Sequence, residues 1–165
     1  MILDLTHTIR EDMPVYPGSP QPAFKPTGNL IRDGFRETMI QFVSHTGTHM
    51  DAPSHLLERG STLDELPVSQ FCGRAAAEYL VSCGLKGVGT DALSVDTLAD
   101  LEFLAHKTLL GGGLVIVESL CLRKVVGRQD MMFFALPMKF VDADGAPVRA
   151  VAEFRDFERE EGAVA

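Results

Sequence analysis

The sequence predicts an α/β fold: one domain over residues 1–165 with a mixed β-sheet, flanking helices and a charged tail from about residue 153. First, 165 residues with 45% hydrophobic and 23% charged side chains fit one domain with a substantial core. Second, residues 114–117 form a continuous apolar run, typical of a strand in a sheet covered on both faces. Third, helix-type and strand-type patterns alternate loosely along the chain.

The first third of the chain predicts two strands and an ordered loop. Residues 2–9 alternate loosely between apolar and polar, as a strand does, and residues 35–44 are typical of a second strand leading directly into a histidine-rich segment. Between them, residues 14–22 contain four prolines, which exclude a helix or a central strand. Tyr16 lies between two of these prolines, either presented to a pocket or covering the core as an aromatic lid.

The middle of the chain predicts short helices around one strand. Residues 64–67 look like the end of a helical turn, and the alanine-rich residues 75–81 favour a helix. Residues 85–91 resemble a short buried strand that ends in a turn. Residues 96–110 predict a second helix, with Asp96 as a possible cap and three glycines at its end.

The last third predicts a hairpin. Glu118 ends the apolar strand 114–117, and residues 132–141 predict another strand, in which Pro137 indicates an edge position or a bulge. Residues 142–145 have turn composition, so residues 147–152 would form the return strand. The charged tail then predicts a solvated helix or a frayed end.

Composition excludes several classes of function. A net charge of -8 argues against nucleic-acid binding, which requires a basic surface. No apolar run approaches the length of a membrane span, and the first residues do not resemble a secretory leader. The three cysteines are odd in number and form no C-x-x-C pair, which indicates reduced, buried thiols. We therefore expect a cytoplasmic protein without nucleic-acid or membrane partners.

Three of the five histidines lie beside a carboxylate within eleven residues, as His45, His49, Asp51 and His55. Such a cluster is poor material for a core, whereas imidazole nitrogen and carboxylate oxygen are good ligands for zinc, manganese or iron. The alternative is that these histidines only form hydrogen bonds with the loop backbone. The sequence therefore favours a metal site, and a hydrolytic metalloenzyme that activates water.

The spacing of the cluster predicts a bend. A straight strand rises about 3.3 Å per residue, which would place His45 and His49 roughly 13 Å apart, too far to share a metal. Gly47 allows the chain to bend between them, and Gly47 and Pro53 both oppose a helix. We expect a bend from strand to loop, with Pro53 fixing the exit.

The His-x3-His-x-Asp pattern leaves coordination positions open, as catalytic sites do. His55 is either a fourth ligand or a general acid/base, and the second role is favoured because a fourth ligand would start to close the site. From spacing alone, His106 and Glu118 fit structural roles better than ligation, although an ionised Glu118 at a strand end needs a cation or strong donors. His7 is interpreted as structural or surface-exposed.

Residues 45–55 reproduce the signature H-x-G-T-H-x-D-x-P-x-H, which resembles that of the cyclase family of metal-dependent hydrolases, including bacterial kynurenine formamidase and isatin hydrolase. The resemblance extends from residue 3 to about residue 152. The other segments that carry it are residues 4–9, 13–18, 87–96, 136–140 and 144–151.

This resemblance implies a swivelling β/β/α-like fold and two divalent metal ions, zinc or manganese. It implies hydrolysis of a C–N bond in a small amide, formamide (arylformamidase-like) or cyclic amide, and a homo-oligomer, either a dimer or a tetramer. The ligands that it implies are His45, His49 and Asp51 for the first metal, His106 for the second, and Asp51 and Glu118 reaching both. His55 corresponds to the catalytic histidine. Tyr16 stands where formamidases carry a substrate-stacking tryptophan, and this chain has none.

The chain departs from the family pattern in length. Family members are longer by about 45 residues, a large share of one domain, and the missing segment is expected near residues 71–75. A second hypothesis is therefore a metal-binding member of the same fold that lacks catalytic activity. A third, an interaction module without metal, would require the histidine cluster to be a coincidence.

Overall fold

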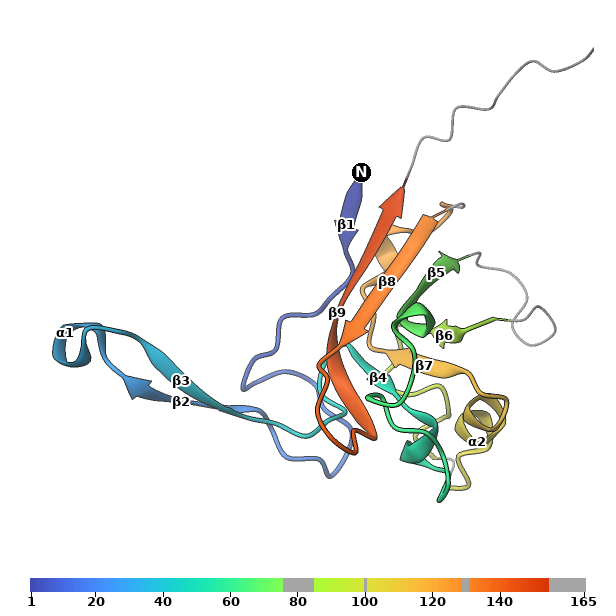
Figure 1. Cartoon of the computed structure of the whole chain (residues 1–165), viewed down its shortest axis with the longest axis horizontal. Coiled ribbons are helices and arrows are strands. Elements are labelled where there is room, and N and C mark those ends of the chain that lie inside the picture. The colour runs from blue at the N-terminus through green and yellow to red at the C-terminus, as the bar shows by residue number, and fades with distance from the viewer. Residues whose placement is uncertain (76–84, 100, 129–130, 155–165) are drawn as a thin grey trace, which may run out of the picture.

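A curled, mixed sheet forms the body of the molecule in this computed structural model, which describes residues 1–75, 85–99, 101–128 and 131–154. Its seven strands run in the order β5-β8-β9-β4-β7-β6, and β1 also pairs with β9 (Figure 1). Only the β6–β7 pair is parallel. The strands are β1 (Ile2–Asp4), β4 (His49–Asp51), β5 (Cys72–Ala75), β6 (Gly87–Gly89), β7 (Val115–Glu118), β8 (Met131–Pro137) and β9 (Gly145–Phe154).

The long strand β9 connects the two halves of the sheet. Its first residues pair with β4, where Gly145 lies opposite Asp51, and its later residues pair with β8 and β1. Alternate residues point to opposite faces of a strand, and along β9 the even-numbered side chains Ala146, Val148, Ala150 and Ala152 are buried. They join Leu5, Met50, Val115 and Val117 in the hydrophobic core. Strand β4 therefore lies between β7 and β9, with its Met50 side chain in this core.

The predicted apolar strand and hairpin are confirmed. All four residues of β7 are buried, as expected of a strand inside a sheet. Strands β8 and β9 form the predicted antiparallel hairpin, although β8 ends at Pro137 instead of residue 141 and β9 begins earlier than expected, at Gly145. The β8 residues that pair with β5 are Met131–Phe134. Pro137 lies beyond them, so no described strand needs its missing N–H on that side. Glu153 and Phe154 belong to β9, and the rest of the charged tail lies outside the described residues.

The helix predicted over residues 96–110 is wrong in its first half. Helix α2 spans only Leu104–Gly111, because Phe103 before it has a left-handed backbone with φ +52°. Asp96 does cap the helix, but from a preceding loop, where its carboxylate accepts hydrogen bonds from the N–H groups of Ala105 and His106 at 2.7 and 3.0 Å. The glycines end the helix as predicted, with Gly113 at φ +78°.

The other short predictions differ in their limits. The first strand stops at Asp4, and residues 85–91 contain only β6. Residues 63–65 form a turn as expected, followed by the 3-10 helix η2 (Val68–Phe71). Of the helix predicted over residues 75–81, Ala75 is instead the last residue of β5, and residues 76–81 lie outside the described residues.

The strand predicted over residues 35–44 belongs to an arm that we define as residues 23–41. Strands β2 (Ala23–Gly28) and β3 (Glu37–Gln41) pair with each other, and the one-turn helix α1 (Leu30–Asp33) closes the tip. Asn29 caps this helix, and Gly34 ends it at φ +78°. Because β3 ends at Gln41, it does not run directly into the histidine cluster, whose His49 and Asp51 lie on the separate strand β4.

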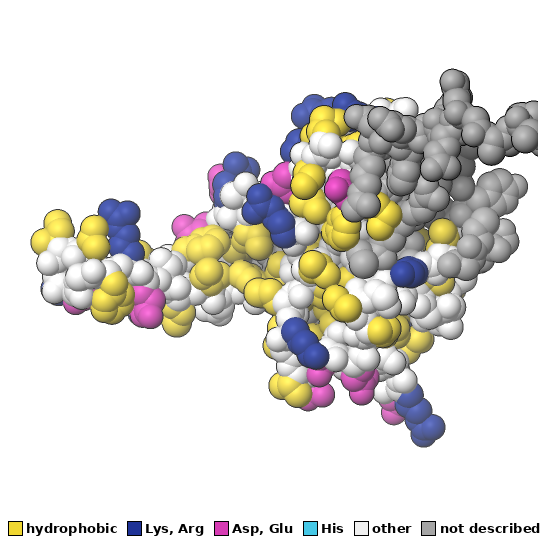
Figure 2. All heavy atoms as spheres, turned by 45° about the horizontal axis from the view of Figure 1, so that its top comes forward, with side chains coloured by type: hydrophobic (Ala, Val, Ile, Leu, Met, Phe, Trp, Pro, Cys, Tyr) yellow, Lys and Arg dark blue, Asp and Glu magenta, His cyan; other side chains and the backbone are white. Residues whose placement is uncertain are grey.

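The arm projects away from the body (Figure 1), and apolar side chains are spread along it (Figure 2). Ile31 at the tip is 97% exposed. The other exposed apolar residues of the arm are Leu30, Phe35, Met39 and Ile40. In the parts of the chain that the structure describes, none of the helices has the length and hydrophobicity needed to cross a membrane.

Candidate metal centre

Strand β4 carries two of the predicted ligands, His49 and Asp51. His49 and Asp51 are two residues apart and therefore share a face of the strand, with 3.3 Å between His49 Nε2 and Asp51 Oδ1. His49 also lies directly opposite Glu118 of β7. Side chains opposite each other in an antiparallel pair are neighbours, and His49 Nε2 is 3.6 Å from Glu118 Oε2. Strand register therefore joins the histidine motif to Glu118.

The predicted bend is present at Gly47, which has φ +66°. It turns the chain so that His45 Nδ1 lies 2.8 Å from Asp51 Oδ1, and the rings of His45 and His49 are 5.1 Å apart. Residue 47 is tightly packed, because a Cβ there would lie 3.2 Å from Met13 Cε. A glycine is required at this point, since side-chained residues rarely adopt this conformation.

The exit of the motif places His55 beside the same cluster. Pro53, which was expected to fix the exit into a loop, instead begins the short 3-10 helix η1 (Pro53–His55). The His55 ring lies 4.0 Å from that of His45 and 5.9 Å from that of His106. His55 therefore faces the site without belonging to the group formed by His45, His49 and Asp51.

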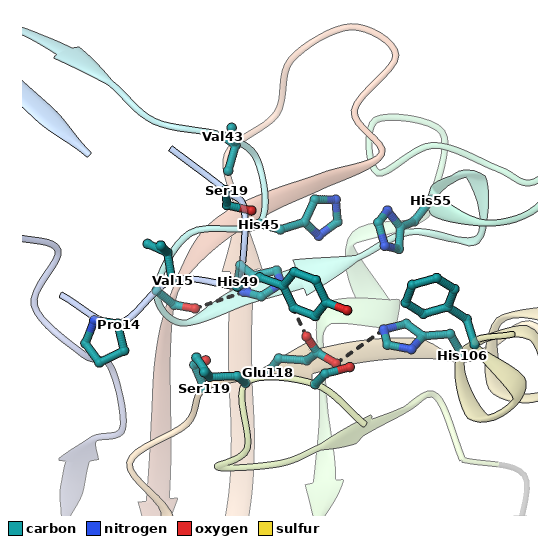
Figure 3. A pocket seen from close by; sticks show the side chains of 15 residues that line it. Pro14, Val15, Ser19, Val43, His45, His49, His55, His106, Glu118 and Ser119 are labelled. Carbon is teal, nitrogen blue, oxygen red and sulfur yellow. Dashed lines mark hydrogen bonds and ion pairs between the residues drawn. The ribbon is translucent and has the colours of Figure 1, made fainter. Parts of the chain in front are cut away.

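Helix α2 and strand β7 bring in the two distant candidates, His106 and Glu118. His106 Nε2 is 3.3 Å from Glu118 Oε1 and 3.5 Å from Asp51 Oδ2. Figure 3 shows His49 and His106 facing Glu118, with His45 and His55 next to each other. Two groups of three result, with ligand atoms within 4.8 Å of one another, and Asp51 belongs to both. They are His45, His49 and Asp51, and Asp51, His106 and Glu118.

These residues fit divalent cations. Asp51 is fully buried, and its Oδ2 atom has no hydrogen-bond donor among the described residues. A buried carboxylate requires a charged partner or several donors. Nitrogen and oxygen ligands of this kind suit zinc or manganese. The geometry thus supports His106 and Glu118 as possible metal ligands, which their spacing in the sequence alone did not.

The charges of the cluster alter its titration. Burial by itself would lower the pKa of His106, but neighbouring carboxylates raise it to about 10, and these are Asp51, Glu118 and Asp96. Burial would raise the pKa of Asp51, but its contacts with histidines hold that pKa well below the usual range. Without a metal, a protonated His106 therefore neutralises part of the buried negative charge.

His45 and His55 titrate in opposite directions. Burial opposes protonation of His45, but the adjacent Asp51 and Asp144 carboxylates outweigh it and raise its pKa. Burial and the positive charge of His45 lower the pKa of His55 to about 4. His55 is therefore a neutral imidazole near pH 7, able to accept a proton.

Sequence reasoning missed Asp96 as part of this site. Asp96 is buried, and its Oδ2 atom lies 2.6 Å from His106 Nδ1, which directs His106 Nε2 toward Asp51 and Glu118. Such a carboxylate fixes the orientation and proton of a metal-binding histidine. The sequence indicated Asp96 only as a possible helix cap. Its contact with His106 could not be predicted, because a loop without periodic pattern brings the two residues together.

Two further residues near the cluster were read only as local structure. Asp144, expected in a turn, lies 3.2 Å from His45 Nε2. Phe103 packs its ring edge-on against His106, with centroids 6.0 Å apart. His7, by contrast, is exposed and contacts Cys121, with 3.2 Å between Nε2 and Sγ, and it belongs to neither ligand group.

The cluster lies at a cavity of about 290 Å³. Tyr16 and its neighbour Pro14 line the cavity, as the pocket interpretation of the proline loop expects. Apolar walls come from Leu93 and Phe103, while His55 and the ligand residues supply the polar side. The cavity therefore combines a group of possible metal ligands with a largely apolar wall.

We expect Asp96→Asn to weaken zinc binding by about 10- to 100-fold, because it removes the charge that holds His106. The affinity is measured by competition between the metal-free protein and a chromophoric chelator. Asp91→Asn, in the same loop but exposed, is the matched control. Equal affinity of the folded Asp96→Asn variant and the control would contradict the assigned role.

Metal binding should release a proton near pH 7, because a cation must displace the proton that the raised pKa of His106 retains. Affinity should accordingly rise about tenfold per pH unit below pH 10 for this proton. Calorimetry in buffers of different ionisation enthalpy measures the release. His106→Gln should lose it, and a release that this substitution does not change would contradict the assignment.

Comparison with known proteins agrees with this geometry. The family model described as "Putative cyclase" matches residues 3–76, which include the whole 45–55 motif. Kynurenine formamidase from Salinibacter ruber is 29% identical over 205 residues, covering 91% of this chain and 96% of the relative. Since 91% of 165 residues is about 150, roughly 55 aligned positions have no residue here. The predicted shortening is therefore supported, and the family match ends near its expected place.

Solved structures share the fold. Isatin hydrolase A from Labrenzia aggregata superposes with a TM-score of 0.77 at 20% identity, covering 92% of this chain and 93% of that one. A predicted metal-dependent hydrolase from Bacillus stearothermophilus superposes with a TM-score of 0.71 at 26% identity, covering 92% and 97%. The motif, the fold and the near-complete alignments agree, and they show that the chain resembles the cyclase family of metal-dependent hydrolases.

Proposed function

We propose that this chain hydrolyses a C–N bond of a small amide, formamide or cyclic amide with the help of bound metal. The observation that carries the proposal is the convergence of two ligand groups and a neutral His55 at one cavity. The names of the relatives, kynurenine formamidase and isatin hydrolase, support this substrate class. The cavity volume suits a small molecule.

We propose two divalent cations, zinc or manganese. His45, His49 and Asp51 would hold one, and His106 and Glu118 the other, with Asp51 shared between them. When bound, such cations lower the pKa of a water molecule and polarise a carbonyl oxygen. The two buried carboxylates, Asp51 and Glu118, support this number, because together they bring two negative charges.

His55 would move the proton during hydrolysis. It stays neutral near pH 7 because burial and the charge of His45 lower its pKa. Its imidazole could therefore take a proton from the attacking water and give it to the leaving nitrogen. Tyr16 and Phe103 would cover the substrate as walls of the cavity, in a chain that has no tryptophan for this purpose.

An inactive metal-binding protein of the same fold is less well supported. It was suggested by the shortened middle of the chain. Nevertheless, His55 and four of the proposed ligands still line one cavity, with the fifth, Asp51, next to them, and these residues come from both sides of the shortening. The loss therefore leaves the chemical groups of the site together.

We also propose a homo-oligomer, a dimer or tetramer, in which the arm packs against another copy. Its apolar residues Leu30, Ile31 and Phe35 are exposed in the single chain, and burying them would be favourable. A cytoplasmic location is proposed because the cysteines are odd in number and Cys121 is a free thiol.

The activity is tested with N-formylkynurenine and isatin in the presence of added zinc or manganese. His55→Ala should lower kcat by about 10²- to 10⁴-fold, the usual contribution of an acid/base group. Metal content, measured by elemental analysis, should stay that of the unmodified protein. Undiminished turnover in the variant would remove His55 from the mechanism, and a metal-loaded protein inactive on a broad amide panel would refute the proposed function.

Ile31→Asp should shift the protein toward the monomer, because it places a charge in the apolar contact of the arm. Light scattering coupled to size-exclusion chromatography measures the mass over a range of concentrations. Val126→Asp makes the same change at an exposed site on the body and serves as the control. If both variants retain the mass of the parent, the arm is not the contact.

A further inference from the structure

A third group of possible ligands lies just outside the two groups of the proposed centre. His45, His55 and Asp144 place ligand atoms within 4.8 Å of one another. The Asp144 Oδ2 atom is 3.2 Å from His45 Nε2 and 3.9 Å from His55 Nδ1. The function proposed above uses His45 as a ligand and His55 for proton transfer, but it gives Asp144 no role.

This outer group is open to solvent, whereas the inner ligands are not. The side chain of Asp144 is 48% exposed, and those of His55 and His45 are 28% and 22% exposed. The side chains of Asp51, His49, His106 and Glu118 are at most 5% exposed. The outer group is therefore more accessible to a hydrated cation than the buried one.

His45 belongs to both groups, through different nitrogens. Its Nδ1 atom faces Asp51 at 2.8 Å, and its Nε2 atom faces Asp144. The ring packs closely against the start of β9, since a Cβ on Gly145 would come within 2.5 Å of His45 Cε1. A neutral imidazole has one lone pair for a metal, so His45 can serve the outer or the inner group at one time.

We propose that His45, His55 and Asp144 form an outer capture site, which binds a divalent cation first and passes it through His45 to the buried ligands. Asp144 supplies the negative charge that attracts the ion, and His55 and His45 replace part of its water shell. Because His45 is shared, the ion leaves the outer group when it joins Asp51 and His49. The proposal rests on metal binding by the inner ligands, as proposed above.

A capture site changes the rates of metal exchange without changing the final affinity. Entry and exit use the same route, so losing the outer group should slow both by the same factor. A residue that only holds His45 in place behaves differently, because its loss speeds release and weakens binding. The two roles of Asp144 are therefore distinguishable.

The test measures zinc uptake and release by the metal-free protein in stopped-flow experiments with a fluorescent chelator. Asp144→Asn keeps an oxygen near His45 but removes the charge, and both rates should fall roughly tenfold, while the dissociation constant stays unchanged. His55→Gln should show the same pattern. Asp142→Asn removes an equal charge in the same turn and should leave both rates unchanged.

Faster release with weaker binding in Asp144→Asn would overturn the proposal, and so would unchanged rates in both outer-site variants. An additional ion bound stably to the parent protein but not to Asp144→Asn would also overturn it, since a transfer site must empty. Failure of the proposed function is seen separately: a protein that exchanges zinc in this way yet cleaves no amide supports the capture site and refutes only the hydrolase.

Discussion

The buried carboxylate of Asp51 is the constraint on which the rest of this structure depends. It lies on β4, between β7 and β9, with no exposure to solvent and with one oxygen lacking a hydrogen-bond donor among the described residues. Such a charge is costly inside a protein unless cations or strong donors surround it. The histidines around it meet this need, and protons or metal ions can each supply the positive charge.

Short elements can build this site because pairing in the sheet sets the positions of its groups. Strand β4 has only three residues, yet its register places His49 opposite Glu118 and Asp51 opposite Gly145. The absence of a side chain at Gly145 leaves room for the His45 ring. Helix α2 contributes His106 from the other direction, and Asp96 fixes both the start of the helix and the orientation of that ring. One loop carboxylate therefore links the fold to the chemistry.

The polarity of the site changes from the surface inward. Asp144 and His55 are partly exposed, whereas Glu118 and His106 are almost fully buried. Outer groups therefore exchange readily with water, and inner groups act in a medium where charges interact strongly. This difference suits a centre that must admit ions and substrate but hold its charge in place. The projecting arm lies apart from this site and carries exposed apolar side chains.

The sequence by itself determined the histidine motif, its bend at Gly47, the buried strand β7 and the β8–β9 hairpin, because each depends on residues close together in the chain. Resemblance to a family added His106 and Glu118, which spacing alone did not support. Only the tertiary structure decided the rest: that Asp96 and Asp144 face histidines, that α2 starts at Leu104, and that residues 23–41 form an arm. Those features arise from contacts between distant segments and from a left-handed residue at Phe103, which no local pattern records.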